Sequence, residues 1–181
     1  LGVGEAPDAD KYGDLGTNTL SNVANAVGGV NLPTMEKLGF GKITEVKNMD
    51  TNHIATVGRL SEKSIGNDST TGHWELAGLI TEQDFSTYPE GFPQELIHSI
   101  QKEANIEFIG NKHASGTEIL KELGREHLSS GKLILYTSGD SVFQIAAHEN
   151  VCSVEELYKI CEISRKYCDE YNIGRVIARP F

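Results

Sequence analysis

Apolar residues at helical spacing predict several helices along the chain. The first is expected to end at Gly28-Gly29, and Pro33 predicts the start of a second, which ends at Gly39. Pro93 predicts the start of a longer helix. The apolar positions that define the first and the third of these helices are Leu20, Val23, Ala24 and Val27, then Leu96, Ile97 and Ile100.

Two capping boxes predict further helix starts, because a Ser hydroxyl and a Glu carboxylate satisfy the free N–H groups of a first turn. They begin at Ser115 and Ser153, each with a Glu three residues later. The first of these helices is expected to stop at Gly124. The apolar positions behind the two boxes are Ile119, Leu120 and Leu123, then Leu157, Ile160, Cys161 and Cys168.

Short apolar or alternating runs between these helices predict strands. They cover Ile106–Ile109, Lys132–Tyr136, Val176–Ala178 and, among weakly patterned residues, Ile54–Val57. Strands that alternate with helices are typical of the α/β class. The pattern changes between Thr81 and Pro93, and this stretch is the predicted domain boundary.

Composition limits the classes of protein that the chain can belong to. Its 181 residues have a formal net charge of −10, and 38% of them are hydrophobic, which argues against intrinsic disorder and against non-specific nucleic-acid binding. No apolar run is long enough to span a bilayer. The three cysteines form no Cys-x-x-Cys pair, which favours a reducing, cytoplasmic environment over a disulfide framework or a zinc site.

The densest group of reactive residue types runs from Asp68 to Glu75. Asp68 is the expected N-cap of a helix, which places the Ser69 hydroxyl at the positive end of the helix dipole, where a phosphate binds favourably. The alternative is an ordinary capped helix start, and spacing alone favours that alternative. The six histidines show no metal-binding spacing, and the chain offers no convincing set of metal ligands.

Two further segments carry candidate binding groups. Ser138 and Asp140 follow a predicted strand, where polar loops of α/β sheets gather ligands, and they could hold sugar hydroxyls. An ordinary turn is an equal alternative, since Ser, Gly and Asp are preferred in turns. Arg175 and Arg179 flank the last predicted strand on one face, where guanidinium groups suit phosphate, although a solvent-facing edge is the simpler interpretation.

Taken together, these segments resemble the phosphopentomutase family of the alkaline phosphatase superfamily. The matching stretches follow the order of the family and cover almost the whole chain. They are residues 2–9, 68–75, 110–112, 114–118, 136–138, 140–142, 144–149 and 174–181.

The resemblance implies a cytoplasmic isomerase that moves phosphate between the 1- and 5-hydroxyls of ribose or deoxyribose. It implies a phosphorylated Thr or Ser, two divalent cations that are usually manganese, and a sugar bisphosphate as activator. The nucleophile that faces the cations maps to Ser69, where threonine is commoner in the family. The substrate contacts of the cap domain map to Ser138, Asp140, Val142, Arg175 and Ile177.

The resemblance also implies an incomplete alkaline-phosphatase-like core portion over residues 1–83, followed by an α/β cap domain over residues 84–181. The Asp and His residues that bind the cations in the family fall outside the 181 residues. The chain alone is therefore expected to bind no cation pair and to be inactive. A non-catalytic module that binds sugar phosphates or a protein partner is the alternative, and a phosphatase or phosphoglycerate mutase of the same superfamily is a third, less favoured interpretation.

Overall fold

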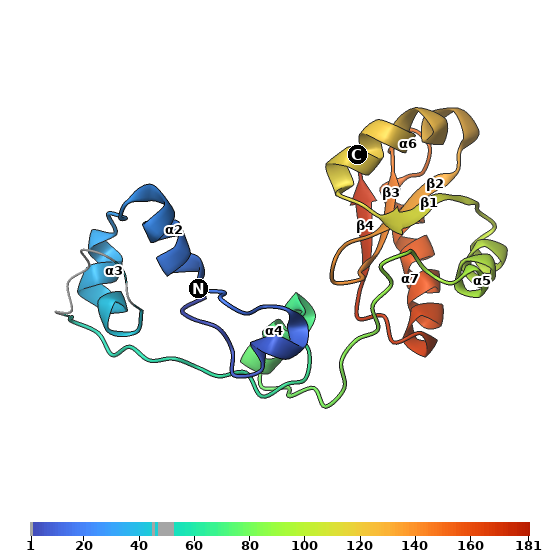
Figure 1. Cartoon of the computed structure of the whole chain (residues 1–181). Helices are drawn as coiled ribbons and strands as arrows, with labels where there is room; N and C mark the ends of the chain where they lie inside the picture. The colour runs from blue at the N-terminus through green and yellow to red at the C-terminus, as the bar shows by residue number, and fades with distance from the viewer. Residues whose placement is uncertain (1, 45, 47–52) are drawn as a thin grey trace. The chain divides into compact units, whose positions relative to one another are not determined.

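The computed structural model describes residues 2–44, 46 and 53–181. By its internal contacts the chain divides into two compact units, Leu1–Lys63 and Ser64–Phe181 (Figure 1). The predicted division between residues 83 and 84 into core portion and cap domain stays a prediction.

The first unit is built from short helices that end at glycines. They are α1 (Ala9–Tyr12), α2 (Thr19–Val27), α3 (Pro33–Leu38) and the 3-10 helix η1 (Phe40–Lys42). Gly28 and Gly39 end α2 and α3 in the left-handed conformation, with φ of 78° and 100°, so both predicted helix ends are confirmed. The strand predicted at Ile54–Val57 is wrong. Ile54 is 83% exposed and its N–H donates to the Lys37 carbonyl (2.8 Å), so the segment has no ladder partner there.

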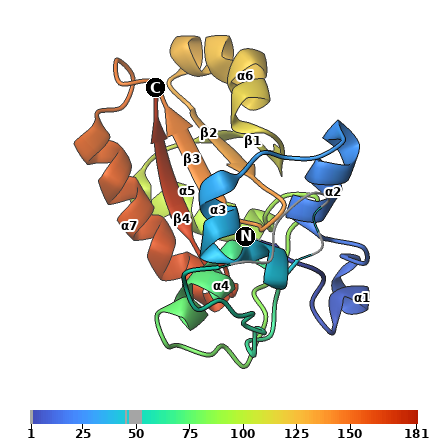
Figure 2. The ribbon, with the colours of Figure 1, turned by 90° about the vertical axis from the view of Figure 1, so that its left-hand side faces the viewer.

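The second unit contains a four-stranded mixed sheet, which places it in the α/β class as predicted. Its strands are β1 (Phe108–His113), β2 (Leu133–Thr137), β3 (Phe143–Ala147) and β4 (Val176–Pro180). They lie side by side in the order β1-β2-β3-β4, as Figure 2 shows. β1 and β2 are parallel, β2 and β3 antiparallel, and β3 and β4 parallel.

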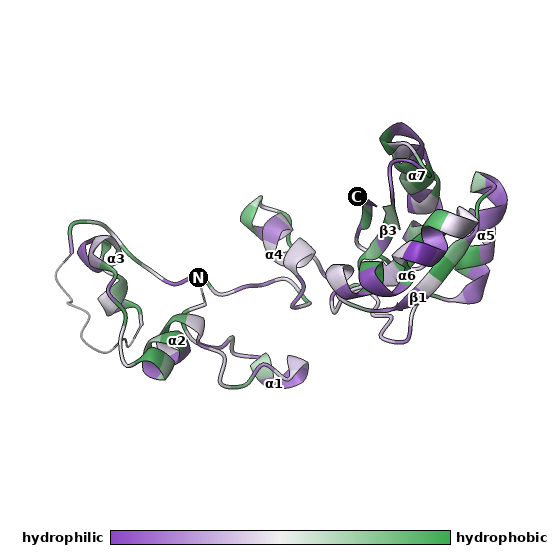
Figure 3. Cartoon of the chain, turned by 90° about the horizontal axis from the view of Figure 1, so that it is seen from above, coloured by the Kyte–Doolittle hydropathy of each residue, from purple (hydrophilic) through white to green (hydrophobic). Residues whose placement is uncertain are grey.

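Helices cover the two faces of this sheet unequally. The unit contains α4 (Ser69–Leu76), α5 (Gln94–Ala104), α6 (Gly116–Ser130) and α7 (Val154–Glu170). α5 and α7 pack on one face, where the larger core includes Leu96, Phe143 and Leu157. α6 packs on β1 and β2 at the opposite face, over a smaller core around Ile119 and Ile134. Apolar and polar segments therefore alternate along these helices in Figure 3.

The capping signals are only partly confirmed. The Ser153 hydroxyl accepts from the Glu156 N–H (3.2 Å) at the start of α7. Ser115 does begin α6, but its hydroxyl contacts the Thr117 hydroxyl (3.0 Å) and makes no capping bond. The predicted stop at Gly124 is wrong, because α6 continues to Ser130. A glycine inside a helix costs only about 1 kcal/mol relative to alanine. The buried side chain of His127, in the next turn, stabilises the helix beyond Gly124.

His127 supplies that burial in the last part of α6. Its side chain is fully buried, and its Nδ1–H donates to the Lys132 carbonyl (2.6 Å) while Nε2 accepts from the His148 N–H (2.8 Å). Both ring nitrogens are therefore satisfied by the backbone. This histidine is a core residue that joins α6 to the sheet.

The strands depart from the sequence prediction most clearly at β1 and β3. β1 lies two residues later at its start than the predicted Ile106–Ile109, and it contains a bulge between Gly110 and Lys112. β3 was not predicted as a strand, because Gln144 interrupts a run of apolar residues with neither helical nor alternating spacing. β3 forms through its pairing with β2 on one side and with β4 on the other.

The core of the second unit predicts a large stability difference between two leucines on its helices. Leu157 in α7 is 0% exposed, whereas Leu128 in α6 is 51% exposed. We expect Leu157→Ala to lower the free energy of unfolding by about 2–5 kcal/mol, because it leaves a cavity in the core. Leu128→Ala, the matched control, should cost less than about 1 kcal/mol. Urea unfolding of both variants checks this, and equal losses would contradict the described packing.

Candidate functional site

The N-terminus of α4 presents the first candidate group. The Asp68 carboxylate caps the helix: Oδ1 accepts from the Thr70 and Thr71 N–H groups at 2.8 and 3.0 Å. Its Oδ2 accepts from the Thr71 hydroxyl (2.5 Å). The predicted N-cap is confirmed, and Ser69 is the first residue of the helix. Both threonines are buried, so Ser69 is the hydroxyl of this group that remains accessible.

Aromatic packing holds α4 against the beginning of β4. The rings of Trp74 and Phe85 meet edge to face, with their centroids 5.6 Å apart. A Cβ added to Gly174 would lie 3.2 Å from the Phe85 ring, so the absence of a side chain at this position permits the close approach. Asn172 fixes the same segment, because its Nδ2 donates to the Asp84 carbonyl (2.8 Å). By contrast, Leu76 and Leu79 are 78% and 55% exposed.

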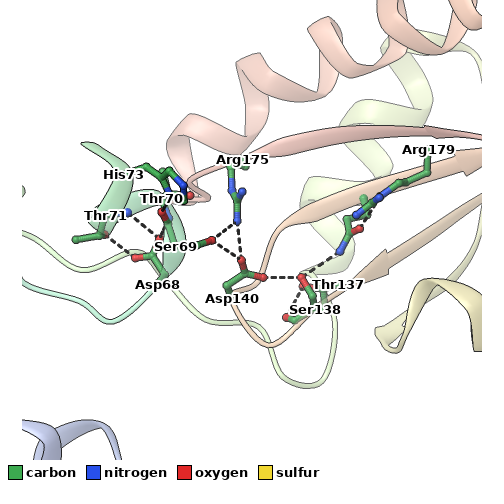
Figure 4. A network of polar contacts seen from close by, with 11 residues as sticks. Asp68, Ser69, Thr70, Thr71, His73, Thr137, Ser138, Asp140, Arg175 and Arg179 are labelled. Carbon is green, nitrogen blue, oxygen red and sulfur yellow. Dashed lines mark hydrogen bonds and ion pairs between the residues drawn. The ribbon is translucent and has the colours of Figure 1, made fainter. Parts of the chain in front are cut away.

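An arginine joins this helix to the loop between β2 and β3. Arg175 Nη2 donates to Ser69 Oγ (2.9 Å) and to Asp140 Oδ2 (2.6 Å). The Ser69 hydroxyl is also 3.4 Å from Asp140 Oδ2, and the Ser138 hydroxyl donates to Asp140 Oδ1 (2.5 Å). Four residues from three separate segments of the sequence therefore form one polar cluster, which Figure 4 shows from close by.

The cluster continues along β3 and β4, on the same face of the sheet as α6. α6 itself covers only β1 and β2 on that face. Residues of alternate positions share a face of a strand, and Gln144 of β3 lies opposite Ile177 of β4. Gln144 Nε2 donates to Ser138 Oγ (3.0 Å), and Arg179 Nε donates to Gln144 Oε1 (3.1 Å). Arg175 and Arg179 thus lie on the same face, as predicted from their spacing.

The five residues predicted as substrate contacts differ in their accessibility. Ser138, Asp140, Arg175 and Ile177 are half-buried, whereas Val142 is only 3% exposed. The structure joins Ser138, Asp140 and Arg175 to Ser69 by hydrogen bonds. The side chains of Val142 and Ile177 carry no polar group, so a hydrogen bond to a substrate from either residue would have to come from its backbone. The assignment of these residues to a substrate stays a prediction.

The environment of Asp140 favours its carboxylate form. Burial alone would raise the pKa of this group, but the hydrogen bond from Ser138, a bond from backbone N–H, the positive charge of Arg175 and the hydrogen bond from Ser69 together outweigh burial. The net effect lowers the pKa of Asp140 below its ordinary value. The cluster therefore offers an ionised acceptor beside a guanidinium donor.

Other reactive residue types are poorly placed for chemistry. Among residues 2–44, 46 and 53–181, no three His, Cys, Asp or Glu side chains come together as a metal site. Burial raises the pKa of the Cys168 thiol to about 12 and those of Cys152 and Cys161 to about 11, so all three are poor nucleophiles at neutral pH. No helix in the described part of the chain has the length and apolar character that crossing a membrane requires.

Gln144 is the member of the cluster that sequence reasoning did not single out. It belongs to a strand in which every residue is buried, and its own side chain is 4% exposed. A buried amide among apolar residues is costly unless both of its ends form hydrogen bonds. The interruption of an apolar run by Gln was therefore the available signal.

The fold and the cluster define an α/β domain in which a serine hydroxyl at a helix N-terminus meets an arginine–aspartate pair on a partly open sheet face. No family model matches the chain. Over 184 residues the chain is 56% identical to the phosphopentomutase of Kosmotoga olearia, 57% identical to that of Caldanaerobacter subterraneus subsp. tengcongensis and 54% identical to that of Clostridium novyi. These matches cover 99–100% of the chain but 47% of each relative.

The chain is thus a homologue of the phosphopentomutases, and the predicted resemblance is confirmed. It spans about half the length of the curated relatives it matches.

The lowered pKa of Asp140 predicts a pH-dependent contribution to stability. Because the pKa is lower in the folded than in the unfolded chain, ionised Asp140 stabilises the fold above the unfolded-state pKa. That stability is lost as the pH falls through the folded-state pKa. We expect Asp140→Asn to be less stable than the parent chain at pH 7, with a difference that narrows as the pH falls below about 4. Urea unfolding across this range checks it, and a constant difference would contradict it.

Proposed function

We propose that this chain carries the phospho-acceptor and part of the sugar-phosphate site of a phosphopentomutase. The observation that carries the proposal is the position of Arg175, whose Nη2 lies within hydrogen-bond distance of both Ser69 Oγ and Asp140 Oδ2. A guanidinium at this position can bind a phosphoryl group on Ser69 and at the same time order the carboxylate that faces the sugar. Homology over the whole chain supports the substrate class, a ribose or deoxyribose phosphate.

The proposed reaction at Ser69 is a phosphoryl exchange with balanced atoms. A sugar bisphosphate first loads a phosphoryl group on Ser69. The free hydroxyl of the pentose phosphate then forms a bond to this phosphorus while the bond from phosphorus to Ser69 Oγ breaks, and the hydroxyl proton passes to Ser69 Oγ. In the second transfer Ser69 Oγ forms a bond to the other phosphorus of the bisphosphate so made, the bond from that phosphorus to the sugar oxygen breaks, and the serine proton passes to this sugar oxygen. The net result of the two transfers is movement of phosphate between the 1- and 5-positions, with Ser69 phosphorylated again.

The residues around Ser69 favour the negative charge that this exchange requires. Ser69 begins α4, where the helix dipole stabilises an anion, and Arg175 adds a full positive charge beside its oxygen. Asp140 and Ser138 are proposed to bind sugar hydroxyls, with Asp140 as the acceptor because its carboxyl stays ionised. Val142 and Ile177 are proposed to contact the apolar side of the sugar ring.

The family resemblance also implies two divalent cations, usually manganese. The donor sets in the described residues do not fit such a centre, because no three carboxylate, imidazole or thiolate groups meet near Ser69. The proposed steps therefore involve only the residues of this chain and the sugar phosphates.

The proposed location is the cytoplasm, which the free state of all three cysteines supports.

The first test of the proposal is phosphorylation of Ser69 in the complete gene product that contains this sequence. After treatment with a pentose or hexose bisphosphate, we expect phosphopeptide mass spectrometry to place one phosphoryl group on Ser69. Ser69→Ala should abolish that group and reduce turnover by at least about 10³-fold, because the acceptor oxygen is lost. Ser69→Thr keeps the hydroxyl and should keep phosphorylation. Phosphate on Thr70 or Thr71 instead would contradict the assignment.

A second test separates binding from catalysis. The 181-residue chain alone is expected to show no turnover of ribose 1-phosphate, because its described residues bring together no three His, Cys, Asp or Glu side chains that could hold a cation beside the Ser69 hydroxyl. A coupled assay for ribose 5-phosphate formation checks this. Measurable turnover by the isolated chain would show that the expected dependence on further residues is wrong.

A further inference from the structure

A chain of directional hydrogen bonds runs along the open sheet face into the proposed site. It passes from Arg179 through Gln144 and Ser138 to Asp140, with N···O or O···O distances of 3.1, 3.0 and 2.5 Å. Asp140 then meets Arg175. Figure 4 shows the contacts of Asp140 with Ser138 and with Arg175 as dashed lines. The members differ in what they can donate or accept, and this difference gives the chain a direction.

The direction begins at Arg179, because a guanidinium only donates hydrogen bonds. Its Nε–H therefore requires the carbonyl oxygen of the Gln144 amide to face it, which turns the Nε2 group toward Ser138. Nε2 in turn only donates, so it occupies a lone pair of Ser138 Oγ. The hydroxyl hydrogen of Ser138 is then directed at Asp140 Oδ1, the other partner of that oxygen.

The fold holds the middle of this chain rigidly. Gln144 lies on β3, which is paired on both sides, opposite Tyr136 of β2 and Ile177 of β4. Its side chain is 4% exposed, and both ends of its amide are bonded. An apolar residue would fill this position in a buried strand at lower desolvation cost, so packing alone does not account for glutamine there.

We infer that Gln144 is a positioning residue for the sugar-phosphate site: oriented by Arg179, it directs the Ser138 hydroxyl toward Asp140 and so fixes the carboxylate that faces the sugar. The inference rests on the proposed function for its effect on substrate, but the orientation itself does not. Without Gln144, the Ser138 hydroxyl is free to rotate away from Asp140 Oδ1. Asp140 Oδ2 still accepts from Arg175, but Oδ1 then has no oriented donor.

The orientation is tested on the 181-residue chain without substrate, at fixed neutral pH. The readout is the ¹³C NMR signal of the Asp140 carboxylate, which responds to the hydrogen bonds that it accepts. We expect Gln144→Met and Ser138→Ala each to shift this signal, and the double variant to show no further shift. Asp68 and Asp84 line the same 210 Å³ cavity as Asp140. Neither substitution changes a charged residue, so a shift of the Asp140 signal reports its hydrogen bonds.

Gln101→Met is the matched control, because it makes the same substitution at an amide that accepts from the Phe108 N–H (2.8 Å) away from the site. It should leave the Asp140 signal in place. A signal that is unchanged in Gln144→Met would overturn the inference. If Gln144→Met fails to fold, Arg179→Met tests the same chain from its outer end, and Arg179→Lys, which keeps a donor, should restore the parent signal.

The effect on ligand is tested by calorimetric titration of the same chain with ribose 5-phosphate. We expect Gln144→Met to weaken binding about three- to tenfold, since one oriented hydrogen bond to a charged group is lost. In the Ser138→Ala background the same substitution should have no added effect. Absence of binding by the parent chain would count against the proposed function and leave the NMR result to decide the orientation. Additive losses in the two backgrounds would contradict the positioning role.

Discussion

The antiparallel pairing of β2 with β3 is the constraint on which the rest of the second unit depends. It makes the chain turn back within residues 138–142, at the end of a strand whose every residue is buried. Because β4 runs parallel to β3, the first residues of β4 lie at the end of the sheet where β2 ends and β3 begins. Asp140 and Arg175 therefore meet there although 35 positions separate them. The pairing of strands, and not proximity in sequence, creates the polar cluster.

Unequal helix cover then decides where polar side chains can lie. α5 and α7 close one face of the sheet over a large apolar core, whereas α6 covers β1 and β2 on the other. The remaining part of that second face carries the buried amide of Gln144 together with serine and arginine side chains that are partly or fully exposed. Their hydrogen bonds to one another offset the cost of burial, which ties the stability of this face to the geometry of the cluster.

Local signals predicted the helices better than the sheet. Gly28, Gly39 and Ser153 determine helix ends or starts through their own backbone or hydroxyl, so spacing and capping rules found them. β3 was not predicted because Gln144 leaves its apolar run with neither helical nor alternating spacing, so only its pairing with β2 and β4 defines it as a strand. α6 continues past Gly124 because burial of a later residue outweighs one glycine. Asp140 and Arg175 could be named as candidates from residue type. Their ion pair could not, because it depends on strand register, and the substrate roles mapped by resemblance remain predictions.

β4, the strand that carries Arg179, is also the last strand of the sheet in the described part of the chain. Such a border strand has unpaired backbone groups along its outer side, which can recruit a strand from another molecule. Pro180 lacks one N–H donor there, and the neighbouring arginine brings a charge that is unfavourable between stacked sheets. Substitution of either residue would therefore affect self-association and solubility as well as any ligand, and loss of solubility would have to be separated from loss of binding at this strand.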